Sequence, residues 1–155
     1  MVFLLGAMVG SPLLAQQGED AVDQYPKEKP VSNPSALIDA KKLLIAGNVQ
    51  DAEASLRKYI EKYPSDPVAY FELARIIAGK KDYPEAKLFA EKAWELDNTN
   101  IWYQLFLAET CKLSQDYEQA VAIYEDIVAT NPDNLDHYYQ LAALYLGLGK
   151  YQQSI

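Results

Sequence analysis

Apolar residues recur with a helical spacing over residues 35–155, and the same pattern of apolar and polar positions returns with a 34-residue period. Leu73 and Ala74, for example, are matched by Leu107 and Ala108 one period later. A fixed period of this size is typical of helical repeat arrays, in which each unit is too small to bury its own apolar face and must stack on the next. The pattern therefore predicts an all-α fold, a right-handed superhelix of antiparallel helix pairs without strands.

Each 34-residue unit divides into two helices, because capping residues and a turn recur inside it. In the second unit Asp66 can cap the first helix with Pro67 at its first position, and Asp82 can cap the next helix. Asn48 and Asp116 are the matching caps of the first and third units. These signals predict seven helices and the start of an eighth at Tyr151; the seven span residues 35–46, 49–62, 67–79, 83–96, 101–113, 117–130 and 135–147.

Residues at fixed places in the unit point to a known repeat. The second unit contains Tyr70, Leu73, Ala74 and Ala86 in this order, and Pro132 closes the third unit. This order resembles the signature of the tetratricopeptide repeat, an aromatic residue followed by Leu-Gly and later by Ala and Pro within one unit. The resemblance covers residues 33–155 and implies an α–α superhelix, with an array at 35–155 of three full repeats and a truncated fourth.

The two ends of the array differ. Asp39 occupies a normally buried position of the first unit, which suits a terminal repeat without a neighbour on that side. The fourth unit stops at Ile155, so Leu141, Tyr145 and Leu148 would lack their usual cover. We therefore expect the chain to be the front part of a longer protein; the alternative is a short native terminus with a frayed last helix.

The first residues suggest export. Residues 1–14 are apolar and uncharged, and the polar segment after Ala15 follows a possible cleavage site, so residues 1–15 are predicted to be a signal peptide. The run is too short to span a bilayer comfortably. The alternatives are an apolar leader without structure or a misplaced start codon. Residues 16–34, with three prolines and many charges, are predicted to be a disordered linker. The chain then resembles a tetratricopeptide repeat protein of the secreted or periplasmic bacterial type.

Composition and isolated reactive residues argue against several functions. A net charge of −8 would repel nucleic acid. The single cysteine, Cys111, allows no intrachain disulfide and occupies a position that is apolar in other units, so it is interpreted as a core residue. The only histidine, His137, is interpreted as a solvent-exposed residue of a first helical turn, on a different unit from Cys111 and Ser114. No phosphate loop or metal-ligand cluster occurs, so we predict no enzyme activity, no cofactor and no metal.

The resemblance implies a binding surface instead. In tetratricopeptide arrays the first helix of each unit lines the concave side, which places a peptide-binding groove at Phe71, Arg75, Trp102, Leu105, Phe106, Glu109, Lys112 and Tyr139. Some members hold a partner's C-terminal carboxylate there with Lys, Asn and Arg. That clamp is not expected in this chain, because the corresponding positions hold Leu37, Lys41, Glu72, Trp102 and Phe106. Ordinary packing between helices is the alternative interpretation of the aromatic residues Trp102 and Phe106.

Two functions follow as hypotheses. The first is a non-enzymatic interaction scaffold outside the cytoplasm, exported to the periplasm or secreted, whose groove binds a peptide or helix of an envelope or secreted protein. It has a protein or peptide partner, no nucleic-acid or small-molecule ligand, and at most a peripheral contact with membranes. The second is the sensing or scaffolding front part of a larger enzyme or signalling protein that continues beyond residue 155.

Overall fold

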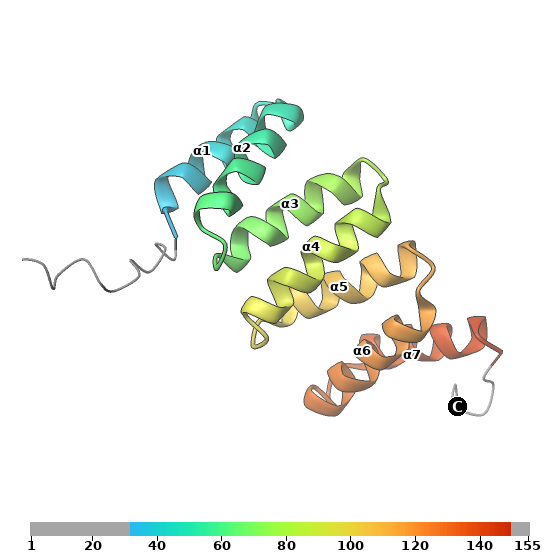
Figure 1. The fold of residues 1–155 in the computed structure, drawn as a ribbon. Coiled ribbons are helices and arrows are strands. Elements are labelled where there is room, and N and C mark those ends of the chain that lie inside the picture. Colours follow the sequence, from blue (N-terminus) through green and yellow to red (C-terminus); the bar gives the residue numbers. More distant parts are fainter. Residues whose placement is uncertain (1–31, 150–155) are drawn as a thin grey trace, which may run out of the picture.

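The structure, a computed structural model, describes residues 32–149, which form seven α-helices and no strand (Figure 1). The helices are α1 (Pro34–Ile45), α2 (Val49–Lys62), α3 (Pro67–Gly79), α4 (Tyr83–Leu96), α5 (Ile101–Leu113), α6 (Tyr117–Thr130) and α7 (Leu135–Gly147). The predicted all-α superhelix is confirmed, and the predicted bounds match except that α1 begins and ends one residue earlier. The predicted signal peptide, most of the predicted linker and the helix expected from Tyr151 lie outside the described residues.

Polar residues begin the helices as the sequence indicates, with one exception. The side-chain oxygen of Asp66 accepts a hydrogen bond from the backbone N–H of Val68 at 3.0 Å, and that of Asp116 accepts from Gln119 at 3.3 Å. The prediction for Asn48 is wrong, because its side chain makes no capping hydrogen bond. The backbone N–H of Asn48 donates to the Leu43 carbonyl at 2.9 Å, which satisfies the end of α1 and not the start of α2.

The turns inside the units share one backbone conformation. Gly47, Lys81, Gln115 and Gly149 have φ values of 81°, 67°, 65° and 71°, and each lies one period after the last. Each is a single residue in the left-handed region between the two helices of a unit, or directly after α7. The 34-residue period of the sequence is therefore also a period of the backbone. Glycine adopts this conformation freely, whereas lysine and glutamine do so at a cost.

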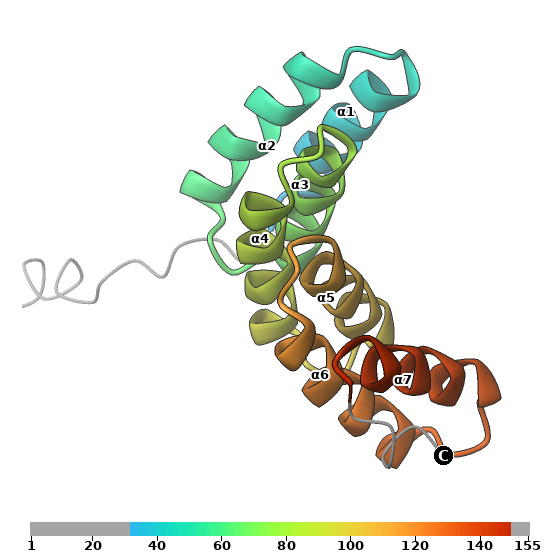
Figure 2. The ribbon, with the colours of Figure 1, turned by 90° about the vertical axis from the view of Figure 1, so that its right-hand side faces the viewer.

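The helices form two layers along a curved array. In Figure 2, α1, α3, α5 and α7 lie on one side and α2, α4 and α6 on the other, and the array curves so that the layer of α1, α3, α5 and α7 is on its inner side. The main packing partners of each helix are its neighbours in sequence, from α1 with α2 to α6 with α7. This stacking makes the inner surface a series of first helices, one from each unit.

The core consists of two clusters of buried side chains. One cluster lies among the first four helices and contains Leu56, Leu73 and Ile77, whereas the other lies mainly among α4 to α7 and contains Leu107 and Ile127. Small side chains fill the positions between packed helices, and seven alanines are completely buried: Ala52, Ala69, Ala74, Ala86, Ala93, Ala108 and Ala120. Only a side chain of this size fits between two helix backbones in contact.

Candidate functional site

The inner surface brings together the residues that the sequence assigns to a groove. Phe71 and Arg75 lie on α3, and Tyr139 lies on α7. The remaining five lie on α5 with helical spacing: Trp102, Leu105, Phe106, Glu109 and Lys112. Residues three and four apart share one face of a helix, so most of the predicted set forms a stripe along α5, flanked by α3 and α7.

An aromatic cluster joins α3 to α5. The ring of Phe71 lies 5.2 Å from the ring of Phe106 in an edge-on arrangement and 4.9 Å from that of Tyr103, and the guanidinium of Arg75 lies over Phe71 at 5.9 Å. Phe71 and Phe106 are half-buried, and Tyr103 is buried. The packing interpretation therefore applies to Phe106, which also contacts the second core cluster together with Leu105. Tyr103 was not predicted, because sequence spacing does not show which rings meet between units.

Trp102 and Tyr139 differ from these residues in their exposure. Each side chain has 70% of its surface exposed. Trp102 lies in the first turn of α5, where its backbone N–H donates to the Asn100 side chain at 3.1 Å and so marks the start of the helix. The alternative that Trp102 is a core residue is wrong. Two large, flat and amphipathic side chains are thus presented to solvent on successive inner helices.

Charged and polar side chains link the inner helices in pairs. Glu72 is only 7% exposed, and its carboxylate contacts Arg75 on the same helix at 3.0 Å and Lys41 of α1 at 3.1 Å. Farther along, the ammonium of Lys112 contacts Glu109 at 2.8 Å and donates to Gln140 of α7 at 3.1 Å. Lys41 and Gln140 thus connect α1 to α3 and α7 to α5 through polar contacts. Neither the pairing of Glu72 nor that of Gln140 was predicted, although the three-residue spacing of Glu72 and Arg75 was a possible signal.

Two equivalent hollows border the inner surface. The first, of about 540 Å³, lies against α3 and is lined by residues that include Leu44, Arg75 and Gly79. The second, of about 350 Å³, lies against α7 and is lined by residues that include Lys112 and Gly147. Gly79 and Gly147 are two periods apart, and both have open space where a side chain would stand. The intermediate unit has Leu113 at this position. Glycine thus leaves open space at both hollows.

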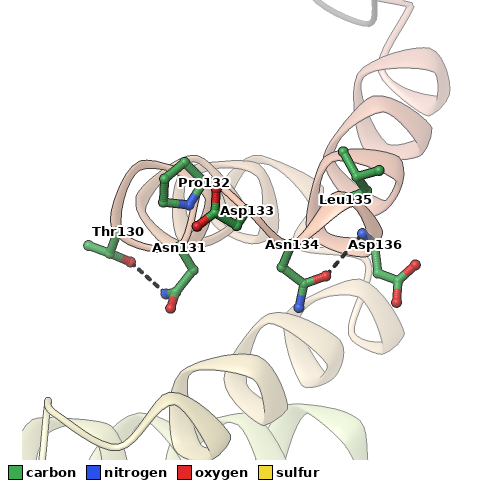
Figure 3. A pocket seen from close by; sticks show the side chains of 7 residues that line it. All are labelled: Thr130, Asn131, Pro132, Asp133, Asn134, Leu135 and Asp136. Carbon is green, nitrogen blue, oxygen red and sulfur yellow. Dashed lines mark hydrogen bonds between the residues drawn. The ribbon is translucent and has the colours of Figure 1, made fainter.

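A third hollow, of about 600 Å³, lies at the turn between α6 and α7 (Figure 3). It is lined by Thr130, Asn131, Pro132, Asp133, Asn134, Leu135 and Asp136. The Asn134 side chain accepts a hydrogen bond from the backbone N–H of Asp136 at 3.1 Å and caps α7. The carboxylates of Asp133 and Asp136 are exposed at this hollow. Its chemistry is therefore polar and acidic.

The residues considered for catalysis are not arranged for it. Cys111 is completely buried, and burial raises the pKa of its thiol to about 12, so the nucleophilic thiolate is not formed at neutral pH. His137 is half-buried rather than exposed as predicted, and its Nε2 lies 3.0 Å from the side-chain nitrogen of Asn134. Across residues 32–149, no three His, Cys, Asp or Glu side chains are placed to hold a metal ion. None of the seven described helices has both the length and the apolar character needed to cross a bilayer.

Comparison with known proteins places this fold in a family. Models of the tetratricopeptide repeat match residues 40–100, 78–145 and 112–155. The protein is thus a helical repeat array, and it belongs to the tetratricopeptide repeat family. A search among curated proteins found no match.

Solved structures with the same fold are distant in sequence. MamA from Desulfovibrio magneticus RS-1 is 19% identical with a TM-score of 0.69, over 78% of this chain and 68% of that chain. The first repeat domain of Spaghetti (RPAP3), solved with the HSP90 peptide SRMEEVD, is 17% identical with a TM-score of 0.65, over 77% of this chain and 98% of that one. An O-GlcNAc transferase from Thermobaculum terrenum is 18% identical with a TM-score of 0.59, over 72% of this chain and 22% of that one.

Proposed function

We propose that this chain is a non-enzymatic interaction scaffold that binds a peptide or helix of a partner protein on its inner surface. The observation that carries the proposal is the exposure of Trp102 and Tyr139, each 70%, on successive inner helices. One similar structure, that of Spaghetti (RPAP3), holds a peptide, which supports a binding role for an array of this kind.

Exposed aromatic side chains of this type are suited to be anchors of an interface. A tryptophan that a partner buries typically contributes about 2 kcal/mol or more to binding, and tyrosine is similarly enriched among such residues. Phe71 and Phe106 are held in place by their contact with each other, so this part of the inner surface is ordered before a partner binds. A partner that covers Trp102 and Tyr139 has to order these two exposed side chains, whereas the rings of Phe71 and Phe106 are already held by their contact.

The substitution Trp102→Ala tests this role. Because the side chain is outside the core, the variant should retain its melting temperature nearly unchanged, whereas capture of the partner from an extract of the source cells should weaken roughly thirtyfold. The matched control is Leu88→Ala, which removes another large exposed side chain, 62% exposed, from α4 in the other layer. Equal capture by both variants would contradict a site at Trp102.

The proposed partner is an envelope or secreted protein, because residues 1–15 have the pattern of a signal peptide. Cleavage after Ala15 leaves Gln16 as the first residue of the mature protein. N-terminal sequencing of the protein from fractionated cells should therefore begin at Gln16, in the periplasm or the medium. A chain that retains Met1 and stays in the cytoplasm would contradict the proposed export, but it would not affect the proposal that the inner surface binds a partner.

A second candidate function is the sensing or scaffolding front part of a larger enzyme or signalling protein. The O-GlcNAc transferase supports this alternative, because the part similar to this chain makes up only 22% of that protein. The gene sequence beyond the codon of Ile155 distinguishes between the two candidate functions. A catalytic or membrane-spanning segment there favours the alternative, whereas further repeats favour the scaffold.

A further inference from the structure

Charge is distributed unequally along the array. Residues 32–92 contain nine acidic and ten basic residues, whereas residues 93–149 contain nine acidic residues and a single basic one, Lys112. The first half also pairs its charges, as in the contacts of Arg57 with Glu53 at 2.9 Å and Glu85 at 2.8 Å. The second half of the array is therefore strongly negative.

The carboxylates of the second half are mostly left without a cation. Among residues 32–149, no ion pair is formed by Asp97, Glu118, Glu125, Asp126, Asp133 or Asp136. Lys112 is already engaged with Glu109 and Gln140. Glu118, Glu125 and Asp126 lie on α6 in the other layer, whereas Asp97 and Asp133 lie in the turns before α5 and α7, and Asp136 lies in the first turn of α7. A surface with a net negative charge attracts a cationic ligand and raises its rate of association.

The exposed aromatic residues lie within this negative half. The 34-residue period places Asp136 on α7 at the position that Trp102 holds on α5. Tyr139 follows Asp136 by three residues, so the two share one face of α7. The hydrogen bond from Lys112 to Gln140 links the side chains of α5 and α7 at this surface. One stretch of the inner surface thus combines Trp102, Tyr139 and Asp136, and Asp136 also borders the acidic hollow of Figure 3.

We infer that this stretch binds a cationic segment of the partner, in which lysine or arginine residues alternate with apolar ones. This inference rests on the proposed function and names the chemistry of its partner. Lysine and arginine are attracted both to carboxylates and to the faces of tryptophan and tyrosine rings. Apolar side chains of the segment pack on Phe106 and the exposed rings. An acidic peptide is disfavoured, because it would meet Asp136 and the net negative charge of this half of the array.

The test uses the purified full chain and two dye-labelled synthetic peptides about 18 residues long, or five helical turns. One is an amphipathic peptide of leucine and lysine, and the other has glutamate in place of every lysine. Fluorescence anisotropy should show binding of the lysine peptide, weakened when salt is raised from about 0.05 M to about 0.5 M, and much weaker binding of the glutamate peptide. Trp102→Ala should weaken binding of the lysine peptide at least tenfold.

Matched variants locate the contact. Asp136→Asn should weaken binding of the lysine peptide roughly threefold, as expected for the loss of one exposed ion pair. Asp51→Asn should leave it unchanged, although Asp51 is likewise an aspartate in a first helical turn, that of α2 in the other layer. Melting temperatures of both variants check the fold, since each loses a charge that suits a helix N-terminus.

The outcomes separate this inference from the proposed function. Equal binding of the two peptides would contradict the inference that the partner is cationic. An equal effect of Asp136→Asn and Asp51→Asn on binding of the lysine peptide would contradict it as well. Equal effects of Trp102→Ala and Leu88→Ala on the lysine peptide would show attraction to net charge alone and would also overturn it. In each case the capture experiment with Trp102→Ala still decides whether the inner surface binds a protein. If Trp102→Ala loses capture of the partner but the chain does not bind the lysine peptide, the proposed scaffold function is retained and only the cationic nature of its partner is rejected.

Discussion

At two of the four left-handed turn positions the chain has a residue other than glycine. Lys81 and Gln115 have φ values of 67° and 65°, whereas the equivalent positions of the neighbouring units are Gly47 and Gly149. The left-handed region costs an ordinary residue roughly 1–2 kcal/mol, which glycine avoids. Part of this difference is offset by the greater freedom of glycine in the unfolded chain. The array therefore tolerates local strain at its middle turns.

Replacing Gln115 by glycine should relieve that strain. The free energy of unfolding is expected to rise by about 0.5–1 kcal/mol in Gln115→Gly, measured by urea denaturation. Gln115→Ala is the control, because alanine keeps the Cβ that causes the strain and should give no gain. A less stable glycine variant would mean that the turn does not hold this conformation in solution.

At the scale of the helices, stability depends on alanines at the points of closest approach. Ala120 is completely buried on α6 in the second core cluster, at the position that Ala86 and Ala52 hold in earlier units. A longer side chain there must push neighbouring helices apart or adopt a strained rotamer. The helix can accept the same change on its exposed side.

The substitution Ala120→Leu should therefore overpack the third unit and reduce the free energy of unfolding by about 1–3 kcal/mol. Thermal or urea denaturation measures this loss. Ala122→Leu on the same helix is the matched control, because Ala122 is exposed, and its stability should remain close to that of the parent chain. An unchanged stability of Ala120→Leu would argue against the repeat register itself.

The sequence predicts where the helices begin and end, but not which side chains meet between them. Helix bounds follow from local signals, such as Asp66 before Pro67, and therefore agree with the structure to within one residue. The place of Phe71 and Trp102 in the inner layer follows from the resemblance to the tetratricopeptide repeat, in which the first helix of each unit lines the concave side. The packing of Phe71 on Tyr103, and the exposure of Trp102, depend on the distance and rotation between units, which no local signal encodes. The burial of Glu72 between Lys41 and Arg75 has the same origin.

At the scale of the whole molecule, the array is built from contacts that are local in sequence. Every main packing partner of a helix is the helix before or after it. Stability is then approximately a sum over units and the interfaces between them, and folding can start in any unit and extend along the chain. The two core clusters fit this description, with Phe89 of α4 packed against both. Folding of such an array is expected to be fast, because few contacts require the closure of long loops.

Packing between sequence neighbours also affects how such a protein can change during evolution. The contacts of α2 with α3, α4 with α5 and α6 with α7 are of one kind, repeated along the chain. Duplication or loss of a 34-residue stretch of the gene would therefore recreate an interface of that same kind instead of breaking a unique core. The inner surface can lengthen or shorten in fixed steps, so the size of the ligand it covers can be adjusted without redesign of the fold.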